Sequence, residues 1–324
     1  MNILYILGNG FDKAQGMATS YPEFYQYLME NTDSSLELFK MKQKIKDDIV
    51  LWSDMEIALG KYTENFSESN EYIDLHIELT QLLRKYLTEE ESKYNPNEKQ
   101  KVTFKNNILI PQNYLLPYDK NQFTTISRSL RATRTQVSFI SLNYTNTLLK
   151  LLSIKNEMKS FMDINMDNLG TILYLHGYLE SEGIIIGVSD AEQIKNEKFR
   201  TNPDIEDIMI KIKSNAAIGN LATSQCENLV KNADIIVIYG SSLGDTDNYL
   251  WKFIERYFKV KSNLCIIQHI HDEDFNKTIP QRRKNFDRKY QNILLNKINL
   301  LNATEQQKSR LFFVYNKNLT ESII

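Results

Sequence analysis

Short apolar runs alternate with amphipathic segments along this chain, and the runs predict the strands of a sheet. The first run, residues 3–7, is apolar and partly β-branched, and it stops at Gly8-Asn9-Gly10. Its length and its lack of polar alternation predict a parallel strand that is buried on both faces. Similar runs occupy residues 137–142, 171–175, 184–186, 234–239 and 264–267.

Between the first two runs, apolar side chains recur every three or four positions, as at Phe24 and Leu28. This spacing predicts amphipathic helices. Residues 92–118 hold three prolines among Asn and Lys and predict a loop. Further helices are predicted over residues 214–231 and 247–258.

The order of strands and helices predicts the fold class and the domains. Alternating β and α segments predict an α/β fold, Rossmann-like, with a doubly wound and mostly parallel sheet. We expect residues 1–30 and 135–324 to form this core and residues 31–134 to form an inserted helical subdomain.

Polar residues follow several of the apolar runs at their carboxyl ends. In open parallel sheets, ligands bind outside the carboxyl ends of the strands. We therefore expect Asn9, Asp12, Asn143, His176 and Ser241 to share one rim of the sheet. This arrangement predicts a ligand site built from residues that lie far apart in the sequence.

Two glycine-containing loops on this rim are candidate phosphate sites. Gly8 and Gly10 lie at a strand-to-helix turn, where backbone N–H groups and the start of a helix can bind an anion. The alternative is a tight turn that binds nothing. In the loop 240–247, Gly240 and Ser241 are expected to contact the ligand, and Asp247 either does so or caps a helix.

Three side chains are candidates for chemistry. His176 suits general-base work or the orientation of a hydroxyl group, and Asn143 offers an amide that can hold a water molecule. The alternative for His176 is a structural role. Glu56 lies four residues after Trp52, which predicts that both project from one helical face. Asp12, Glu56 or Asp245 would supply a negative charge to the site, and Trp52 would either exclude solvent or belong to the core.

Several motifs together resemble the AbiH family of bacterial abortive-infection proteins. They are Ile6-Leu7-Gly8-Asn9-Gly10-Phe11-Asp12, Gly16, Thr19-Ser20-Tyr21 with Phe24, Trp52-Ser53-Asp54-Met55-Glu56, Ser141-Leu142-Asn143-Tyr144-Thr145, Leu175-His176-Gly177, and Gly240-Ser241-Ser242-Leu243 with Asp247. They extend over most of the chain. The resemblance implies an anti-phage effector, for which a phage-encoded trigger and a homo-oligomer are the expected partners.

The order of these motifs also resembles, more remotely, the SIR2-like NAD-binding group. This likeness implies a Rossmann-like fold, NAD as the substrate or ligand, and hydrolysis of NAD to nicotinamide and ADP-ribose. It implies that Asn143 positions the attacking water and that His176 contacts the nicotinamide ribose. The segment Gly8-Asn9-Gly10-Phe11-Asp12 would bind the dinucleotide, and Ser241 its phosphate or ribose.

Composition and charge narrow the choice of partner. The 324 residues carry 39 basic and 41 acidic side chains, so no overall positive charge attracts nucleic acid or anionic lipid. Two cysteines cannot form a disulfide framework or the paired-cysteine zinc module of SIR2-like deacylases. No apolar run approaches the roughly 20 residues that a membrane span needs. We expect a cytoplasmic protein without a secretion leader, membrane contact or bound metal.

Two alternative functions remain at this point. His269 and His271, with the acidic residues after them, could recruit a metal in a nuclease or phosphodiesterase; a strand that ends in an acidic loop is the alternative for this segment. The other function is a non-catalytic module that senses a nucleotide through the glycine loops. His76, in an apolar helical stripe, is expected to pack in the core.

Overall fold

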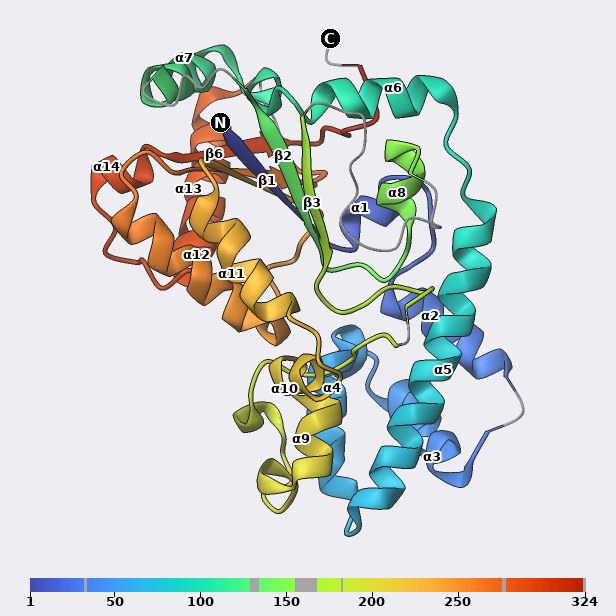
Figure 1. Ribbon diagram of the computed structural model, residues 1–324. Helices are drawn as coiled ribbons and strands as arrows, with labels where there is room; N and C mark the ends of the chain where they lie inside the picture. The colour runs from blue at the N-terminus through green and yellow to red at the C-terminus, as the bar shows by residue number, and fades with distance from the viewer. Residues whose placement is uncertain (32–33, 129–133, 155–167, 182, 276–277, 323–324) are drawn as a thin grey trace.

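The computed structural model describes the chain except residues 32–33, 129–133, 155–167, 182, 276–277 and 323–324 (Figure 1). The strands are β1 (Asn2–Leu7), β2 (Gln136–Ser141), β3 (Leu169–Tyr174), β4 (Ile235–Tyr239), β5 (Cys265–Ile270) and β6 (Leu311–Tyr315). The helices are α1 (Gly10–Lys13), α2 (Tyr21–Glu30), α3 (Leu36–Asp47), α4 (Met55–Tyr62), α5 (Ser69–Lys93), α6 (Glu98–Asn107), α7 (Pro117–Ser127), α8 (Thr147–Leu152), α9 (Pro203–Met209), α10 (Lys211–Ala217), α11 (Ala222–Asn232), α12 (Asn248–Val260), α13 (Pro280–Lys297) and α14 (Glu305–Lys308). Short 3₁₀ segments are η1 (Leu51–Ser53), η2 (Thr63–Asn65), η3 (Pro111–Tyr114), η5 (Ala191–Gln193), η6 (Phe199–Thr201) and η7 (Asp245–Asp247).

In the described part of the chain, six strands form one parallel sheet in the order β3-β2-β1-β4-β5-β6. This is the strand order of Rossmann-like folds, and it confirms the predicted fold class. The order reverses between β1 and β4, because the chain crosses from edge strand β3 to the far side of β1. Leu7 pairs with both Ser141 and Tyr239, so the carboxyl ends of β2, β1 and β4 lie level.

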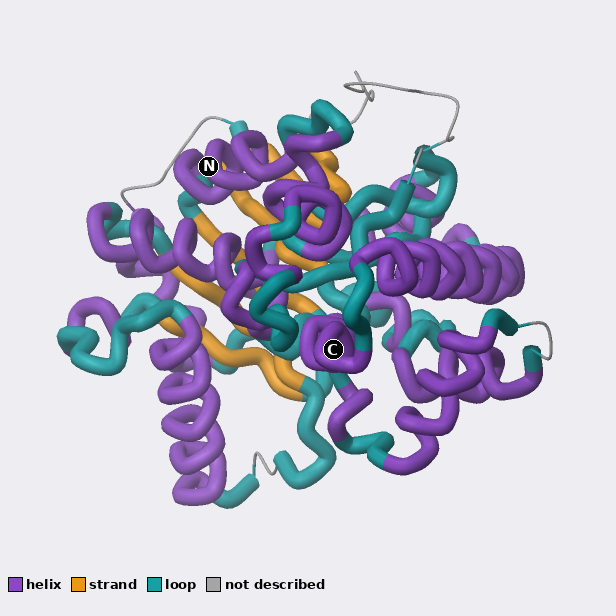
Figure 2. Tube along the Cα trace, turned by 90° about the horizontal axis from the view of Figure 1, so that it is seen from below, coloured by secondary structure: helices purple, strands orange, loops and turns teal. Residues whose placement is uncertain are grey.

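Helices cover both faces of the sheet, which explains the unbroken apolar strands (Figures 1 and 2). In β1, Leu4 and Ile6 pack towards α11, α12 and α13. The alternate residues Ile3, Tyr5 and Leu7 pack on the opposite face, towards α6, α7 and α8. Successive side chains of a strand point to opposite faces, so a strand that is covered on both sides needs apolar residues at every position.

A separate helical lobe lies beyond the carboxyl ends of the strands, at the bottom of Figure 1. Its core joins α2, α3, η1, α4 and α5 to α9 and to the extended segment before it. Phe24, Trp52, Leu79, Ile186 and Met209 are buried members of this core. The lobe therefore combines two parts of the chain that lie far apart in the sequence.

The division into a core and a helical subdomain at 31–134 remains a prediction. The hydrophobic clusters of the structure do not begin and end at these residues. Phe104 of α6 and Phe123 of α7 pack against the sheet and not with the lobe. Residues of the segment 179–210, by contrast, belong to the core of the lobe.

The run 184–186 does not form a strand, although its composition predicted one. Its side chains pack into the lobe, and the carbonyl oxygen of Ile186 lies 2.9 Å from Nε2 of His76. The apolar character of this run comes from burial in a helical core, where no strand lies beside it. His76 is buried, as predicted. Strand β6 was not among the predicted strands.

Two further predictions, one of a loop and one of a helix, were also wrong. The loop expected at 92–118 contains α6 and the start of α7, each flanked by short connections. The helix expected at 214–231 is two helices, α10 and α11, separated at Gly219, whose φ is +68°. Among the described helices, none is both long and apolar enough to cross a membrane.

The contact between the turns after β1 and β4 predicts an unequal cost for two glycine substitutions. Gly240 and Gly219 have almost the same positive φ, +69° and +68°. A Cβ at Gly240 would overlap the backbone of Gly10 and Phe11, whereas a Cβ at Gly219 would meet no atom within 4 Å. We expect Gly219→Ala to lower the free energy of unfolding by about 1–2 kcal/mol through backbone strain. Gly240→Ala should lower it by about 2–5 kcal/mol, because overpacking is added to the strain.

Denaturant unfolding of the two variants beside the unmodified chain measures this difference. Equal losses would show that the two turns can separate to admit a methyl group.

Candidate functional site

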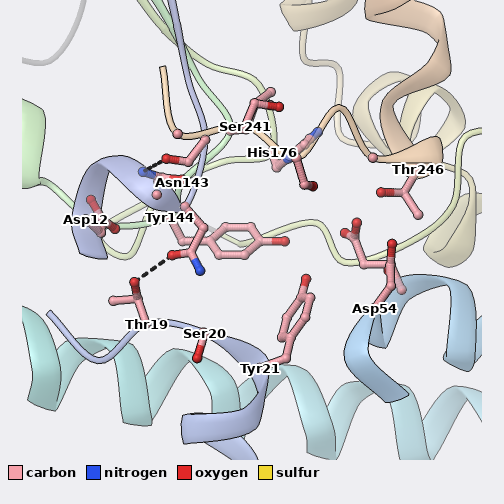
Figure 3. A pocket seen from close by; sticks show the side chains of 18 of the residues that line it. Asp12, Thr19, Ser20, Tyr21, Asp54, Asn143, Tyr144, His176, Ser241 and Thr246 are labelled. Atoms are coloured by element: carbon pink, nitrogen blue, oxygen red, sulfur yellow. Dashed lines mark hydrogen bonds between the residues drawn. The ribbon is translucent and has the colours of Figure 1, made fainter. Parts of the chain in front are cut away.

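A cavity of about 530 Å³ lies between the carboxyl ends of the strands and the helical lobe (Figure 3). It is located where the strand order reverses, the position at which open α/β sheets bind ligands. The sheet side supplies Gly8, Asn9, Gly10, Asp12, Leu142, Asn143, Tyr144, Thr145, His176, Gly240, Ser241, Ser242 and Gly244. The other lining residues are Thr19, Ser20, Tyr21, Pro22, Ser53, Asp54, Glu56, Leu83, Leu87, Lys211, Thr246 and Asp247.

The glycines of the two loops are explained in part by contact between the loops themselves. The amide of Gly10 donates to the carbonyl oxygen of Gly240 at 2.8 Å. A Cβ at Gly8 or Gly10 would lie 2.7 Å from backbone atoms of the second loop. The helix expected after this turn, α1, is a single turn of four residues. It therefore adds little dipole field, and the amides of Gly8 and Gly10 are already hydrogen-bonded to the carbonyl oxygens of Tyr239 and Gly240.

The side chain of Asn143 is hydrogen-bonded to the loop that follows β1. Its Nδ2 donates to the carbonyl oxygen of Gly8 at 3.1 Å, which fixes the amide beside the cavity. Thr19, at the entry to the lobe, donates to Oδ1 of Asn9 at 2.6 Å. Figure 3 shows both hydrogen bonds at one end of the cavity. The turn after β1 is thus connected both to the end of β2 and to the lobe.

Asp12 is a buried carboxyl group in the cavity wall, with 1% of its surface exposed. Its Oδ2 accepts a hydrogen bond from Thr145 at 2.6 Å, while Oδ1 has no hydrogen-bond partner among the described residues. Burial raises the pKa of Asp12 to about 6, although Thr145, Thr147 and Asn143 hold the rise back. Asp12 is therefore a carboxyl group that titrates close to neutral pH.

Four ionisable side chains form a buried chain at the other end of the cavity. Nε2 of His176 lies 2.9 Å from Oδ1 of Asp247, and the same oxygen accepts a hydrogen bond from Nζ of Lys211 at 2.9 Å. Lys211 also donates to Oε2 of Glu56 at 2.8 Å. The exposed fractions are 2% for His176, 8% for Asp247, 1% for Lys211 and 6% for Glu56. The chain connects the loop after β3, the start of α12, α10 and α4.

Lys211 sets the charge state of this cluster. Burial alone would lower the pKa of Lys211, but the carboxylates of Asp247 and Glu56 outweigh it and raise the pKa. Burial also opposes ionisation of Asp247, yet Lys211 and His176 hold its pKa below the usual range. For Glu56, burial is the larger effect and raises the pKa. The ammonium group is therefore charged, and it holds Asp247 ionised.

The predicted site residues divide into those that line the cavity and one that does not. The cavity brings together Asn143, His176, Gly8, Asn9, Gly10, Asp12, Gly240, Ser241, Asp247 and Glu56. Phe11, expected in the cofactor site, instead packs with Phe104 and Tyr239 in the core beneath the sheet. Its position follows from the helical turn of α1, which directs Phe11 towards the sheet.

Two predictions about individual side chains need correction. Asp247 is the N-cap residue of α12, but its side chain makes no capping hydrogen bond because it is bound to Lys211 and His176. Glu56 and Trp52 do not share a helix, since α4 begins at Met55 and Trp52 lies in η1. Trp52 is 2% exposed and belongs to the core of the lobe.

Sequence reasoning missed Lys211 and Tyr144. The hydroxyl of Tyr144 donates to the carbonyl oxygen of Ile185 at 2.9 Å, and its ring reaches across the middle of the cavity in Figure 3. Tyr144 directly follows Asn143 and could have been found from that neighbour. Lys211 carries no local signal, because its two carboxylate partners are 155 and 36 residues away in the sequence.

The histidines of the alternative metal site lie elsewhere. His269 is buried between the rings of Tyr114 and Tyr239, and burial lowers its pKa to about 3. Across the part of the chain that the structure describes, no group of three or more His, Cys, Asp or Glu side chains could hold a metal ion. His269 and His271 therefore have no ligand set around them in this part of the chain.

Removal of the Lys211 charge should destabilise the protein strongly. Lys211→Met would leave two buried carboxyl groups without their cation, and we expect a loss of about 3–5 kcal/mol in the free energy of unfolding. Lys213→Met is the matched control, because Lys213 pairs with Glu206 with 46% of its side chain exposed. Its loss should stay below about 1 kcal/mol. Similar losses in denaturant unfolding of the two variants would contradict the assignment.

Asp12 should make stability depend on pH in the direction opposite to that of most aspartates. The pKa of Asp12 in the folded protein, about 6, lies above its ordinary value of 3.8. The contribution of Asp12 to the free energy of unfolding is therefore fully present below pH 3.8 and is lost as the pH rises through 6. Asp12→Asn removes this loss. We expect its free energy of unfolding, relative to the unmodified chain, to increase by up to about 3 kcal/mol between pH 4 and pH 8. A difference that does not change with pH would contradict the raised pKa.

Comparison with known proteins agrees with the motifs on the rim. No curated protein matches the chain. The family model described as bacteriophage abortive infection AbiH matches residues 4–269. This range contains most or all of each strand from β1 to β5, and it contains all the residues that line the cavity. The chain therefore belongs to the AbiH family and acts in bacteriophage abortive infection.

Proposed function

We propose that the cavity binds NAD and hydrolyses its nicotinamide–ribose bond when phage infection activates the protein. The observation that carries this proposal is the convergence of Asn143, His176 and several carboxyl groups around one cavity at the reversal of strand order. Its volume of about 530 Å³ lies within the range typical of small-molecule sites. Cleavage of NAD would deplete an infected cell of its cofactor, which suits an abortive-infection effector.

The charges around the cavity favour the cationic end of NAD. Asp12, Asp54, Glu56 and Asp247 supply carboxyl groups, while Lys211 is the lysine among the described lining residues. Loss of nicotinamide passes through a sugar with oxocarbenium character, as in glycoside hydrolysis. Nearby carboxylates stabilise such a cation. The nicotinamide ribose would therefore occupy the acidic part of the cavity.

The two loops would receive the rest of the dinucleotide. Each begins at the carboxyl end of a strand beside the strand-order reversal, and each lines the cavity with backbone and small polar side chains. The hydroxyl of Ser241 is a suitable donor to phosphate or ribose oxygens, whereas the amides of Gly8 and Gly10 already donate to Tyr239 and Gly240. Gly8, Asn9 and Gly10 would contact the dinucleotide from the β1 side, and Gly240 and Ser241 from the β4 side.

The neighbours of Asn143 and His176 support the roles that we propose for them. The hydrogen bond to Gly8 restrains the amide of Asn143, as orientation of a water molecule requires. Asp247 restrains the imidazole of His176, and the hydroxyl of Tyr249 lies 3.4 Å from the same ring nitrogen. An imidazole with restrained orientation is suited to hold a ribose hydroxyl. In the reaction, the water oxygen bonds to C1′ as the C1′–N bond breaks, and the electron pair of that bond leaves with nicotinamide.

Assay of NAD cleavage tests the proposal. We expect the activated protein to release nicotinamide, and His176→Ala and Asn143→Ala to reduce the rate at least about 100-fold. His271→Ala is the matched control, because His271 is exposed and lies away from the cavity lining. The same three variants should be compared in infected cells, since NAD cleavage by a resting enzyme would harm its host.

Other outcomes separate the alternatives. Binding of NAD without cleavage, with protection retained in both active-site variants, would favour the nucleotide-sensing module. A bound metal that is lost in His271→Ala would favour the nuclease. Unchanged NAD levels in infected cells that the protein still protects would contradict the proposal.

A further inference from the structure

We infer that Asp12 is the general base that accepts the proton of the attacking water. This inference rests on the proposed function and adds a step to it. The hydrolysis releases one proton: as the water oxygen bonds to C1′, one of its O–H bonds must break. Nicotinamide leaves as a neutral molecule with the electron pair of the broken bond, so it needs no proton. A base in the cavity wall can take up this proton, and no acid is needed.

The carboxyl group of Asp12 has an oxygen that the fold does not use. Oδ2 is held by Thr145, whereas Oδ1 is buried and has no hydrogen-bond partner in the described part of the chain. An unpartnered buried carboxylate oxygen costs free energy, which is a reason to look for a functional partner. Water bound in the cavity beside Asn143 would supply one.

Hydrogen bonds from the segment after β2 hold Asp12 near Asn143. Thr145, two residues beyond Asn143, donates to Asp12, and Asn143 itself donates to Gly8, four residues before Asp12. The end of β2 thus holds the turn after β1 from both sides. A water molecule oriented by Asn143 would have Asp12 as an adjacent proton acceptor.

Carboxyl groups at the other end of the cavity are engaged with other partners. Asp247 binds both Lys211 and His176, and Glu56 binds Lys211 and the amide of Gly187. Lys211 and His176 lower the pKa of Asp247, which makes Asp247 a weak base. Both oxygens of Glu56 are already hydrogen-bonded, one to Lys211 and the other to the amide of Gly187. The negative charge of Asp247 instead suits stabilisation of the cationic sugar.

The groups that face Asp12 set the pH at which it accepts a proton. Glu91 of α5 adds a negative charge, although it also binds the amide of Asn146 and lies 3.6 Å from Lys150. Tyr94 and Tyr174 border the same carboxyl group and stay neutral, because burial raises their pKa values. Together with burial, these neighbours bring the pKa of Asp12 to about 6, where a base is effective at neutral pH.

Two variants test the role of Asp12 in the activated full-length protein. Asp12→Asn keeps an oxygen that can accept the hydrogen bond of Thr145 but cannot take a proton. We expect kcat at pH 8 to fall at least about 100-fold while KM for NAD and the affinity for ADP-ribose change less than about threefold. Asp204→Asn, at an exposed position of α9, is the control and should match the unmodified rate.

Thr145→Val tests the role of Asp12 through the pH dependence of the activity, which would not change if the role of Asp12 were only structural. The unmodified protein should lose activity as the pH falls through about 6, because the base becomes protonated. Thr145→Val removes a hydrogen bond that lowers the pKa of Asp12, so this acid limb should shift to higher pH.

The outcomes separate this inference from the proposed function. Absence of NAD hydrolysis in the activated unmodified protein overturns both. Hydrolysis that persists in Asp12→Asn with the same acid limb overturns the role of Asp12 alone. If Asp12→Asn does not fold, an unshifted acid limb in Thr145→Val overturns it.

Discussion

The buried ammonium group of Lys211 is the contact on which the arrangement of the cavity depends. It binds Glu56 from the helical lobe and Asp247 at the start of α12, a helix that packs on the sheet, and through Asp247 it also holds His176. Buried ion pairs add little net stability, because desolvation of the charges offsets their attraction. Their geometry is nevertheless restrictive, since any separation leaves a charge without a partner. Lys211 therefore fixes where the lobe lies relative to the strand ends.

Around this contact, the two ends of the cavity differ in their electrostatics. At one end Asp247 is held ionised by a buried cation, and at the other Asp12 is buried without one. Environments that push the pKa values of two carboxyl groups apart are common in hydrolases, where the groups take different tasks. The proposed division of labour, in which one carboxylate stabilises the sugar cation and another accepts a proton, uses this difference.

Local sequence predicted the strands of the sheet where a strand is covered on both faces. Residues 3–7 and 235–239 are apolar at every position because helices pack on each side. The same signal failed at 184–186, since burial in a helical lobe selects the same residue types as burial in a sheet. The loop predicted at 92–118 failed for the opposite reason: polar residues also occur in short, half-exposed helices such as α6, and Pro117 is the first residue of α7.

The sequence by itself determined the Rossmann-like fold, the rim of polar residues and the family, because strand direction alone carries the ends of parallel strands to one edge. Tertiary structure decided the rest. It turned Phe11 into the core, assigned Asp247 to Lys211 and not to a helix cap, and left one oxygen of Asp12 without a partner. These outcomes depend on contacts between residues far apart in the chain, and on the burial that such contacts produce. Periodicity and motif spacing report only on near neighbours, so they could not reveal them.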